Sequence, residues 1–412
     1  MDIRWRGPLF VAIILALPGV CVPVFSSDGV RAATTVSALA PATTIAVASS
    51  PSDNPPSTSV GDAPAISDAL QTTSADATAT LQATPADATA TLQTLLDQAE
   101  SLAPLETVIV AQHGDVLAER GYRDHSTTAP TNIKSASKVV MSALVGIAID
   151  KQLLEGTEQR VAALLQADLP ADPDPRMQQL TIGHLLSMQA GLESTSGAGY
   201  GGWVASQNWV RAALARPFVD VPGGRMIYST GSTHLLSAIL TRVSGRSTLQ
   251  LSRDWLGGLE DFRITSWIRD PQGIYMGGNQ MAMSPRSLLA LGELYRRGGI
   301  SPSGQRLISQ AWIDASWQMR TTSPWTGDGQ GYAWFLTQIA GEQVRYGWGY
   351  GGQMLYVVPR LGLTVVMTSD ERASSARTGH RDDLHRLLGS IMAVLQHSEA
   401  PVSGAPAAQC CA

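Results

Sequence analysis

The sequence has very little cysteine and lysine, and it lacks any long run of charge of one sign. Its three cysteines are Cys21, Cys410 and Cys411, so the span between them holds no disulfide framework and no cysteine-based metal site. The formal net charge is −5, without the clustered Lys and Arg of a nucleic-acid-binding face. His380 and His385 have no matching acidic set, so no metal or cofactor is expected.

One sequence motif of nucleotide-binding proteins and one of α/β-hydrolases are missing as well. No glycine-rich loop of the kind that cradles phosphates occurs in the chain. There is also no Gly-x-Ser-x-Gly motif, which argues against an α/β-hydrolase. The sequence therefore favours neither a nucleotide-binding protein nor that class of serine enzyme.

The N-terminal part has the composition of an export signal followed by a tether. Residues 1–32 carry Arg4 and Arg6 near their start and continue into the short apolar run Leu9–Val20, which predicts a secretory signal. Residues 33–93 are rich in Ala, Thr, Ser and Pro, with too few large apolar groups to offset the entropy of ordering. We expect an exported protein, periplasmic or secreted, that a disordered tether holds near a membrane or cell wall. The folded domain is predicted at 94–398 and a disordered tail at 399–412.

Strand-like segments lie at both ends of the predicted domain, and helical segments lie between them. Residues 106–122 read as a hairpin, and 354–358 and 363–368 read as two further strands. The stretch from Ser135 to Lys151 is almost wholly apolar, which predicts a buried helix. We predict an α+β fold in which one antiparallel sheet, built from both chain ends, is flanked by helices and carries an inserted, mainly helical domain at about 155–255. Two consecutive domains are the alternative.

Ser135 and Lys138 open the buried helix and are the first candidate catalytic pair. Residues three apart share a helix face, so the hydroxyl and the amine can meet. A serine hydroxyl needs a neighbour to take its proton, and a desolvated lysine can do so. Arginine cannot, because it stays protonated. The alternative is a serine cap beside a surface lysine, but the apolar residues that follow Lys138 argue against it.

Three segments resemble the β-lactamase-related serine hydrolases, which include class C β-lactamases, DD-peptidases, family VIII esterases and 6-aminohexanoate-dimer hydrolases. Asn132–Lys138 is similar to the nucleophile motif, and Thr181–Leu192 resembles the segment that follows it. Pro222–Thr230 looks like the tyrosine motif. The resemblance spans roughly residues 104 to 395 and implies a β-lactamase/transpeptidase-like fold. The branch with the 6-aminohexanoate-dimer hydrolases is indicated by Trp267, Asp270–Gly273 and Gly277–Gly278.

The resemblance implies a role for each matching residue. Ser135 is the expected nucleophile, Lys138 its base, and Tyr228 the group that passes a proton to the leaving group. Thr230 stands where the family often has Asn, and its hydroxyl offers fewer hydrogen bonds than an amide. Trp348 stands within the third motif, where a cation is usual.

These departures affect the expected substrate. Trp348 cannot pair with a substrate carboxylate, which favours an ester or an uncharged amide over a β-lactam or a D-Ala-D-Ala peptide. Gly349 permits a close backbone approach. An oxyanion hole is expected from the backbone N–H groups of Ser135 and Tyr350. We therefore expect a small-molecule ester, amide or peptide-like substrate, bound partly by Thr230, Trp348 and Gly349.

Two aromatic residues in a glycine-rich loop, Tyr200 and Trp203, are further candidate substrate contacts. The function predicted is an exported serine hydrolase that acts through an acyl-enzyme, without metal or cofactor. A β-lactamase or D-Ala-D-Ala carboxypeptidase is one alternative. A non-catalytic, penicillin-binding-like sensor that grips cell-wall fragments is another. The sequence does not indicate an oligomeric state.

Overall fold

The computed structural model describes residues 85–398. The predicted signal segment at 1–32, most of the tether at 33–93 and the tail at 399–412 lie outside the described residues. Among the residues that are described, no helix is long and apolar enough to cross a membrane.

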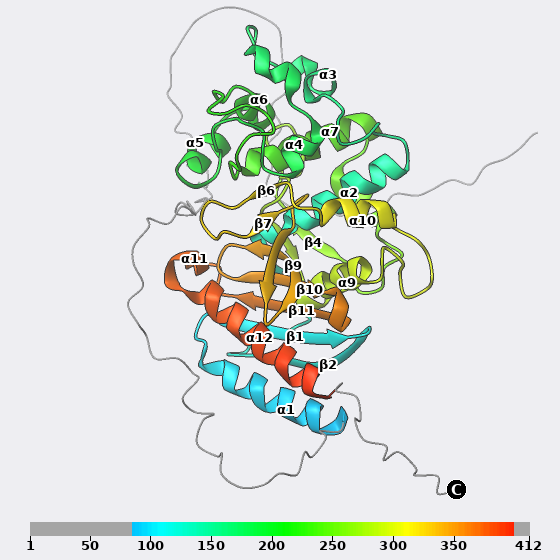
Figure 1. Ribbon diagram of the computed structural model, residues 1–412. Coiled ribbons are helices and arrows are strands. Elements are labelled where there is room, and N and C mark those ends of the chain that lie inside the picture. Colours follow the sequence, from blue (N-terminus) through cyan, green and yellow to red (C-terminus); the bar gives the residue numbers. More distant parts are fainter. Residues whose placement is uncertain (1–84, 399–412) are drawn as a thin grey trace, which may run out of the picture. The chain divides into compact units, whose positions relative to one another are not determined.

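The main feature is a single antiparallel sheet assembled from both ends of the described chain (Figure 1). The β1–β2 hairpin comes from the N-terminal side, and β1 pairs with β11, which lies more than 250 residues later in the chain. In spatial order the strands are β2 Asp115–Gly121, β1 Leu105–Gln112, β11 Leu363–Ser369, β10 Gln353–Val358, β9 Glu342–Gly349, β8 Phe335–Ile339, β7 Gly329–Gln330 and β6 Thr321–Thr322. This arrangement confirms the predicted sheet built from both chain ends.

Helices cover both faces of this sheet. On one face, α1 (Pro85–Gln98) and α12 (His380–Ser398) run side by side, as the blue and red helices of Figure 1 show. On the other face, α9 (Pro285–Arg296) packs against β10 and β11. Strands β10 and β11 are buried along their whole length because both faces are covered.

Helix α1 begins nine residues before the predicted domain boundary at 93/94. Leu92 and Leu96 are fully buried and belong to the same apolar cluster as β1, β10 and α12. Residues 85–93 are therefore part of the folded domain and not of the tether. The Ala- and Thr-rich composition concealed the start of this helix. Its few large apolar residues, which face the sheet, are too few to give a periodic signal.

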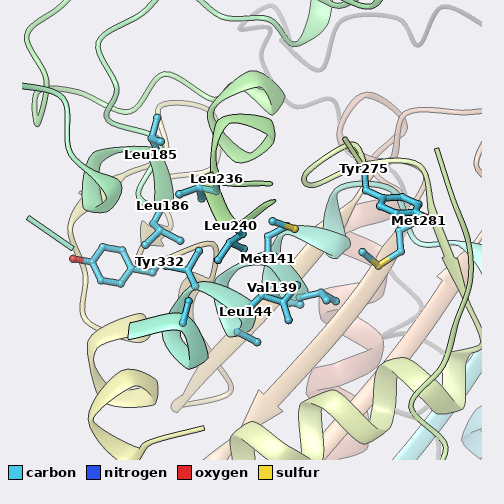
Figure 2. Packing of buried hydrophobic residues seen from close by; sticks show 14 of the residues in the cluster. Val139, Met141, Leu144, Leu185, Leu186, Leu236, Leu240, Tyr275, Met281 and Tyr332 are labelled. Atoms are coloured by element: carbon cyan, nitrogen blue, oxygen red, sulfur yellow. The ribbon is translucent and has the colours of Figure 1, made fainter. Parts of the chain in front are cut away.

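A mainly helical region follows α2 (Lys138–Asp150) and joins it to the sheet. Figure 2 shows Val139, Met141 and Leu144 of α2 packed near Leu236 and Leu240 of α7. The helices of this region are α3 Val161–Leu164, α4 Ile182–Leu186, α5 Tyr200–Val204, α6 Trp209–Leu214, α7 Thr230–Ser244 and α8 Thr248–Trp255. Eleven of the thirteen residues of α2 are buried, as its apolar composition predicts.

A second, small sheet leads into the segment that carries Ser135. Its order is β3 (Thr131–Asn132), β5 (Met281–Met283) and β4 (Ile264–Trp267). The N–H of Ile133 donates to the carbonyl of Met281 at 2.9 Å, which extends the pairing by one residue. The chain therefore enters the Ser135 segment from a fixed position. The remaining helices are α10 (Gln310–Ser316) and α11 (Ser375–Thr378), and α11 packs against α12.

Candidate active site

Ser135 lies in a single 3-10 turn, Lys134–Ser137, that leads directly into α2. Lys134 has a φ of 48°, in the left-handed region that residues other than glycine rarely adopt. The Asn132 side chain accepts the N–H of Lys134 at 3.0 Å, and the Lys134 ammonium pairs with Glu371 at 2.9 Å. Backbone strain of this kind costs about 1–3 kcal/mol and clusters at functional sites. The turn presents Ser135 half-buried, while Lys138 behind it is buried.

Lys138 is held by oxygen atoms from three different elements. Its Nζ lies 3.1 Å from Ser135 Oγ, 2.7 Å from the carbonyl of Gly278 and 3.5 Å from Thr230 Oγ1. A neutral amine has two N–H groups and one lone pair. The carbonyl of Gly278 and the hydroxyl of Thr230 can accept the two protons, which leaves the lone pair facing the hydroxyl of Ser135. The arrangement suits a base that removes the serine proton.

Tyr228 and Thr230 come from the segment that begins α7. The Lys138 Nζ lies 4.8 Å from the centroid of the Tyr228 ring, so the amine and the phenol are neighbours. Thr230 Oγ1 lies 3.0 Å from Ser196 Oγ, which also accepts the N–H of Thr230 at 2.9 Å. Thr230 therefore faces Lys138 from a buried position, and it does not line the cavity described below.

The end of β9 runs very close to the turn that carries Ser135. A Cβ atom on Gly349 would lie 2.3 Å from the carbonyl oxygen of Ile133, and one on Gly347 would lie 3.0 Å from a methyl of Val139. Only glycine fits at such a distance from a backbone oxygen. The close approach brings Tyr350 and Ser135 to the same cavity, where both line the wall.

A cavity of about 860 Å³ opens above Ser135. Tyr228, Trp348, Gly349 and Tyr350 line it, as the sequence predicts for this set. Its other lining residues come mainly from the loops around 193–202, 216–227, 323–326 and 374–382. Its aromatic side chains include Trp325, whose ring stands edge-on to that of Tyr228 at 6.4 Å.

Neighbouring side chains hold the ring of Trp348 in place. Its indole N–H donates to Ser375 Oγ at 3.1 Å, and the Arg381 guanidinium lies 5.2 Å from its ring centroid. Arg381 in turn pairs with Asp328 and Asp382. Burial raises the pKa of Tyr346 well above its ordinary value, so its phenol stays protonated and donates to Asp328 at 2.6 Å.

Tyr200 and Trp203 do not line the cavity, contrary to the expectation that they contact the substrate. Both are buried, and burial raises the pKa of Tyr200. The glycines beside them, Gly199 and Gly202, line the cavity instead. The sequence could not reveal this, because on the short helix α5 a residue and its neighbour face different sides. Arg345, the cation nearest to Trp348 in the sequence, does not line the cavity, and its guanidinium lies 5.8 Å from the ring centroid of Trp317.

Three contributors were not predicted as site residues. Gly278 offers its carbonyl to Lys138, Ser196 binds Thr230, and Arg381 brings a cation to the cavity wall. Gly278 was noted only as a family-like residue, and a carbonyl contact leaves no side-chain signal. Arg381 is one of many arginines in the chain, and its position depends on how α12 packs.

Among residues 85–398, no group of three or more His, Cys, Asp or Glu side chains is arranged to hold a metal ion.

The antiparallel sheet flanked by helices, with the Ser135–Lys138 turn at the edge of the helical region, defines a β-lactamase/transpeptidase-like fold. Residues 88–389 match the beta-lactamase family, and the chain belongs to this family. It is a β-lactamase-fold serine hydrolase, as the sequence resemblance implied. A comparison with curated protein sequences gave no match.

Solved structures with the same fold carry varied activities in their names. A Bacillus anthracis protein named as a candidate 6-aminohexanoate-dimer hydrolase is 16% identical, with a TM-score of 0.60 over 73% of this chain and 81% of that one. An octameric penicillin-binding protein homologue from Pyrococcus abyssi is 19% identical, with a TM-score of 0.55 over 72% and 76%. EstCE1, a hydrolase with promiscuous acyltransferase activity, is 19% identical, with a TM-score of 0.58 over 73% and 98%. At these identities the likeness concerns the fold.

Proposed function

We propose that this protein hydrolyses an ester or an uncharged amide through a covalent acyl-enzyme on Ser135. The observation that carries the proposal is the 3.1 Å contact between Lys138 Nζ and Ser135 Oγ at the wall of an open cavity. Nucleophile and base within hydrogen-bonding distance, with the base oriented by further groups, is the arrangement that covalent catalysis requires. The carbonyl of Gly278 and the hydroxyl of Thr230 provide that orientation.

In the acylation step, Ser135 Oγ attacks the substrate carbonyl carbon while its proton passes to the Lys138 amine. The backbone N–H groups of Ser135 and Tyr350 hold the oxyanion, each such donor being worth about 3 kcal/mol. The bond to the leaving group then breaks, and the leaving group takes the proton from Lys138 by way of the Tyr228 phenol. Water attacks the ester on Ser135, the same groups move its proton, and the free acid leaves.

The character of the cavity favours a substrate without a carboxylate near the reacting bond. Trp348 occupies the wall beside Gly349, with Arg381 against its ring. The two other arginines that line the cavity, Arg216 and Arg225, pair with Glu193 and Asp220. Two aspartates already pair with Arg381, and its side chain is only 13% exposed. We therefore place an apolar or aromatic substituent of the substrate against Trp348, Phe335 and Trp325.

Treatment of the full-length protein with a fluorophosphonate probe, followed by intact-mass spectrometry, tests the proposal. A single adduct that maps to Ser135 and is lost in Ser135→Ala is the expected result. No adduct on the folded protein would refute the hydrolase proposal and leave the non-catalytic binding protein as the better reading. A panel of esters, amides and β-lactams then distinguishes the substrate classes, and rapid β-lactam turnover would contradict the preference for uncharged substrates.

We also propose that the protein is exported and acts in the periplasm or outside the cell. The support is the sequence of residues 1–32, with its arginines and its short apolar run. Fractionation of expressing cells with N-terminal sequencing of the mature protein tests this. A protein that stays in the cytoplasm with residues 1–32 intact would refute it.

A further inference from the structure

A fully buried histidine and aspartate lie behind the site. His234, on α7, and Asp270, in the loop after β4, both have side chains that are 0% exposed. His234 Nε2 lies 3.1 Å from Asp270 Oδ2. The proposed chemistry does not use either residue. Burying such a pair is costly unless its hydrogen bonds are satisfied, so the bonds that it makes indicate what it does.

The contacts of Asp270 fix which nitrogen of His234 carries the proton. Asp270 Oδ1 accepts the backbone N–H groups of Gln272 and Ile274, at 2.9 and 2.8 Å. A carboxylate only accepts hydrogen bonds, so Oδ2 takes the proton of His234 Nε2. In the neutral ring, Nδ1 is then an acceptor, and it faces the backbone N–H of Gly277 at 3.4 Å. One tautomer satisfies both partners.

The Gly277–Gly278 segment connects this pair to the catalytic lysine. The N–H of Gly277 faces His234, and the carbonyl of Gly277 accepts the hydroxyl of Thr233 at 3.0 Å. The next carbonyl, that of Gly278, accepts Lys138 Nζ at 2.7 Å. The segment packs so tightly that a Cβ on Gly277 would lie 2.0 Å from the carbonyl oxygen of Thr233. The segment is therefore held by close packing against α7 and by these hydrogen bonds, of which the one to His234 is made by the residue directly before Gly278.

Aromatic rings surround the histidine. The rings of Trp203 and Trp209 both stand edge-on to His234, with centroids 5.6 Å away. The Trp203 indole N–H donates to the carbonyl of Trp209 at 2.9 Å, which fixes the two rings together. Helices α5 and α6, which carry these two rings, thus cover the histidine, and a weak polar contact such as the one to Gly277 is stronger in so dry a setting.

We infer that His234 and Asp270 are positioning residues, which hold the Gly278 carbonyl against Lys138 through the N–H of Gly277 and so orient the amine toward Ser135. The inference rests on the proposed role of Lys138. The pair takes no proton from the substrate and touches none of the reacting atoms. Its role is to fix one acceptor of the amine, which leaves the lone pair directed at the serine hydroxyl.

The variant Asp270→Asn tests this with little change in shape. Asn Oδ1 can keep both loop N–H contacts, and its amide nitrogen then donates to His234 Nε2. The proton of the ring must move to Nδ1, where it meets the N–H of Gly277, so two donors face each other. His234→Gln is the conservative partner, because a glutamine amide can still donate to Asp270 and accept from Gly277. Asp168→Asn is the matched control, since Asp168 is a buried carboxylate paired with Arg211 and Arg242 elsewhere.

The readout is the ¹³Cε resonance of Lys138, which is resolvable because the chain has lysines only at 134, 138 and 151. We expect Asp270→Asn to shift the Lys138 resonance at pH 7 and leave the other two unmoved, and to slow fluorophosphonate labelling of Ser135 at least about tenfold. In the single variant His234→Gln, the Lys138 resonance and the labelling rate should both stay close to those of the wild type. Asp168→Asn should change neither. If Asp270→Asn does not fold, His234→Phe gives the same test, because it keeps the ring and removes both hydrogen bonds.

An unmoved Lys138 resonance in the folded variant overturns the inference, as does an equal shift in Asp168→Asn. A loss in His234→Gln as large as that in Asp270→Asn also overturns it, because it would indicate general damage to the core. The resonance decides the matter even in a protein that does not react with the probe. Failure of wild type to label at Ser135 would instead refute the proposed function.

Discussion

Thr230 offers the sharpest test of how Lys138 is oriented. The variant Thr230→Val keeps the shape of the side chain and removes the hydroxyl that lies 3.5 Å from Lys138 Nζ and 3.0 Å from Ser196 Oγ. The Lys138 amine becomes an ammonium as it takes the serine proton, and a hydrogen bond to a charged group is worth about 1.5–3 kcal/mol; this one is long, so we take the lower end. A loss of about 1.5 kcal/mol in the transition state corresponds to a rate roughly tenfold lower.

The assay is the rate of adduct formation at Ser135, followed by intact mass at several fluorophosphonate concentrations. Thr230→Ser is the matched control, since it keeps the hydroxyl and should label within about threefold of wild type. The free energy of unfolding should fall by only about 1 kcal/mol in Thr230→Val, because one buried hydroxyl contact is lost. Labelling of Thr230→Val at the wild-type rate would refute the reasoning, since the amine would then be oriented without Thr230.

Three further predictions concern the site wall, the pH dependence and the domain boundary. Gly349→Ala should abolish Ser135 labelling even where circular dichroism shows a folded protein, because its Cβ would lie 2.3 Å from the Ile133 carbonyl oxygen; a reactive variant would contradict the close approach. Burial, and secondarily the charge of Arg381, lowers the pKa of His385 to about 4. The unfolded chain takes up this proton near pH 6.5 and the folded one does not, so stability should fall by about 3 kcal/mol as the pH drops from 6.5 to 4. In urea melts, His385→Phe should lack this loss of stability between pH 6.5 and 4. An unchanged dependence of the free energy of unfolding on pH would refute the role of His385. Leu92→Ala should lower the free energy of unfolding by about 2–5 kcal/mol in the same melts. A change below about 0.5 kcal/mol would mean that α1 is not part of the folded domain.

Several features of the fold follow from local pattern and were predictable. The β1–β2 hairpin joins a run of β-branched and apolar residues to a tight turn at His113–Gly114, and the α2 segment is apolar on every side, which only a buried helix tolerates. The β10 and β11 strands are continuous runs of β-branched and apolar residues, as strands covered on both faces are. The start of α1 was missed, because a helix of small residues has almost no periodic signal until its partner α12 is in place.

In the candidate site, too, some residues could be predicted from the sequence and others could not. Ser135 and Lys138 were nominated from residue type and spacing, since few side chains can replace a serine hydroxyl and a lysine amine in this chemistry. Tyr228 was nominated from its resemblance to the tyrosine motif of the family. Which neighbours orient them could not be nominated, because those contacts join residues up to 140 positions apart and include a backbone carbonyl that any residue could supply. Tyr200 and Trp203 illustrate the limit: their place in a glycine-rich loop suggested substrate contacts, but packing buries Trp203 against His234 and Tyr200 against Trp203.

The sequence by itself determined the chemistry available to this protein, because side-chain type sets what can attack, accept a proton or pack in a core. The tertiary structure alone decided the direction of each group: Trp203 into the core, Arg381 against Trp348, and the Gly278 carbonyl onto Lys138. Directions of this kind depend on how strands and helices from distant parts of the chain pack, and no local pattern carries that information.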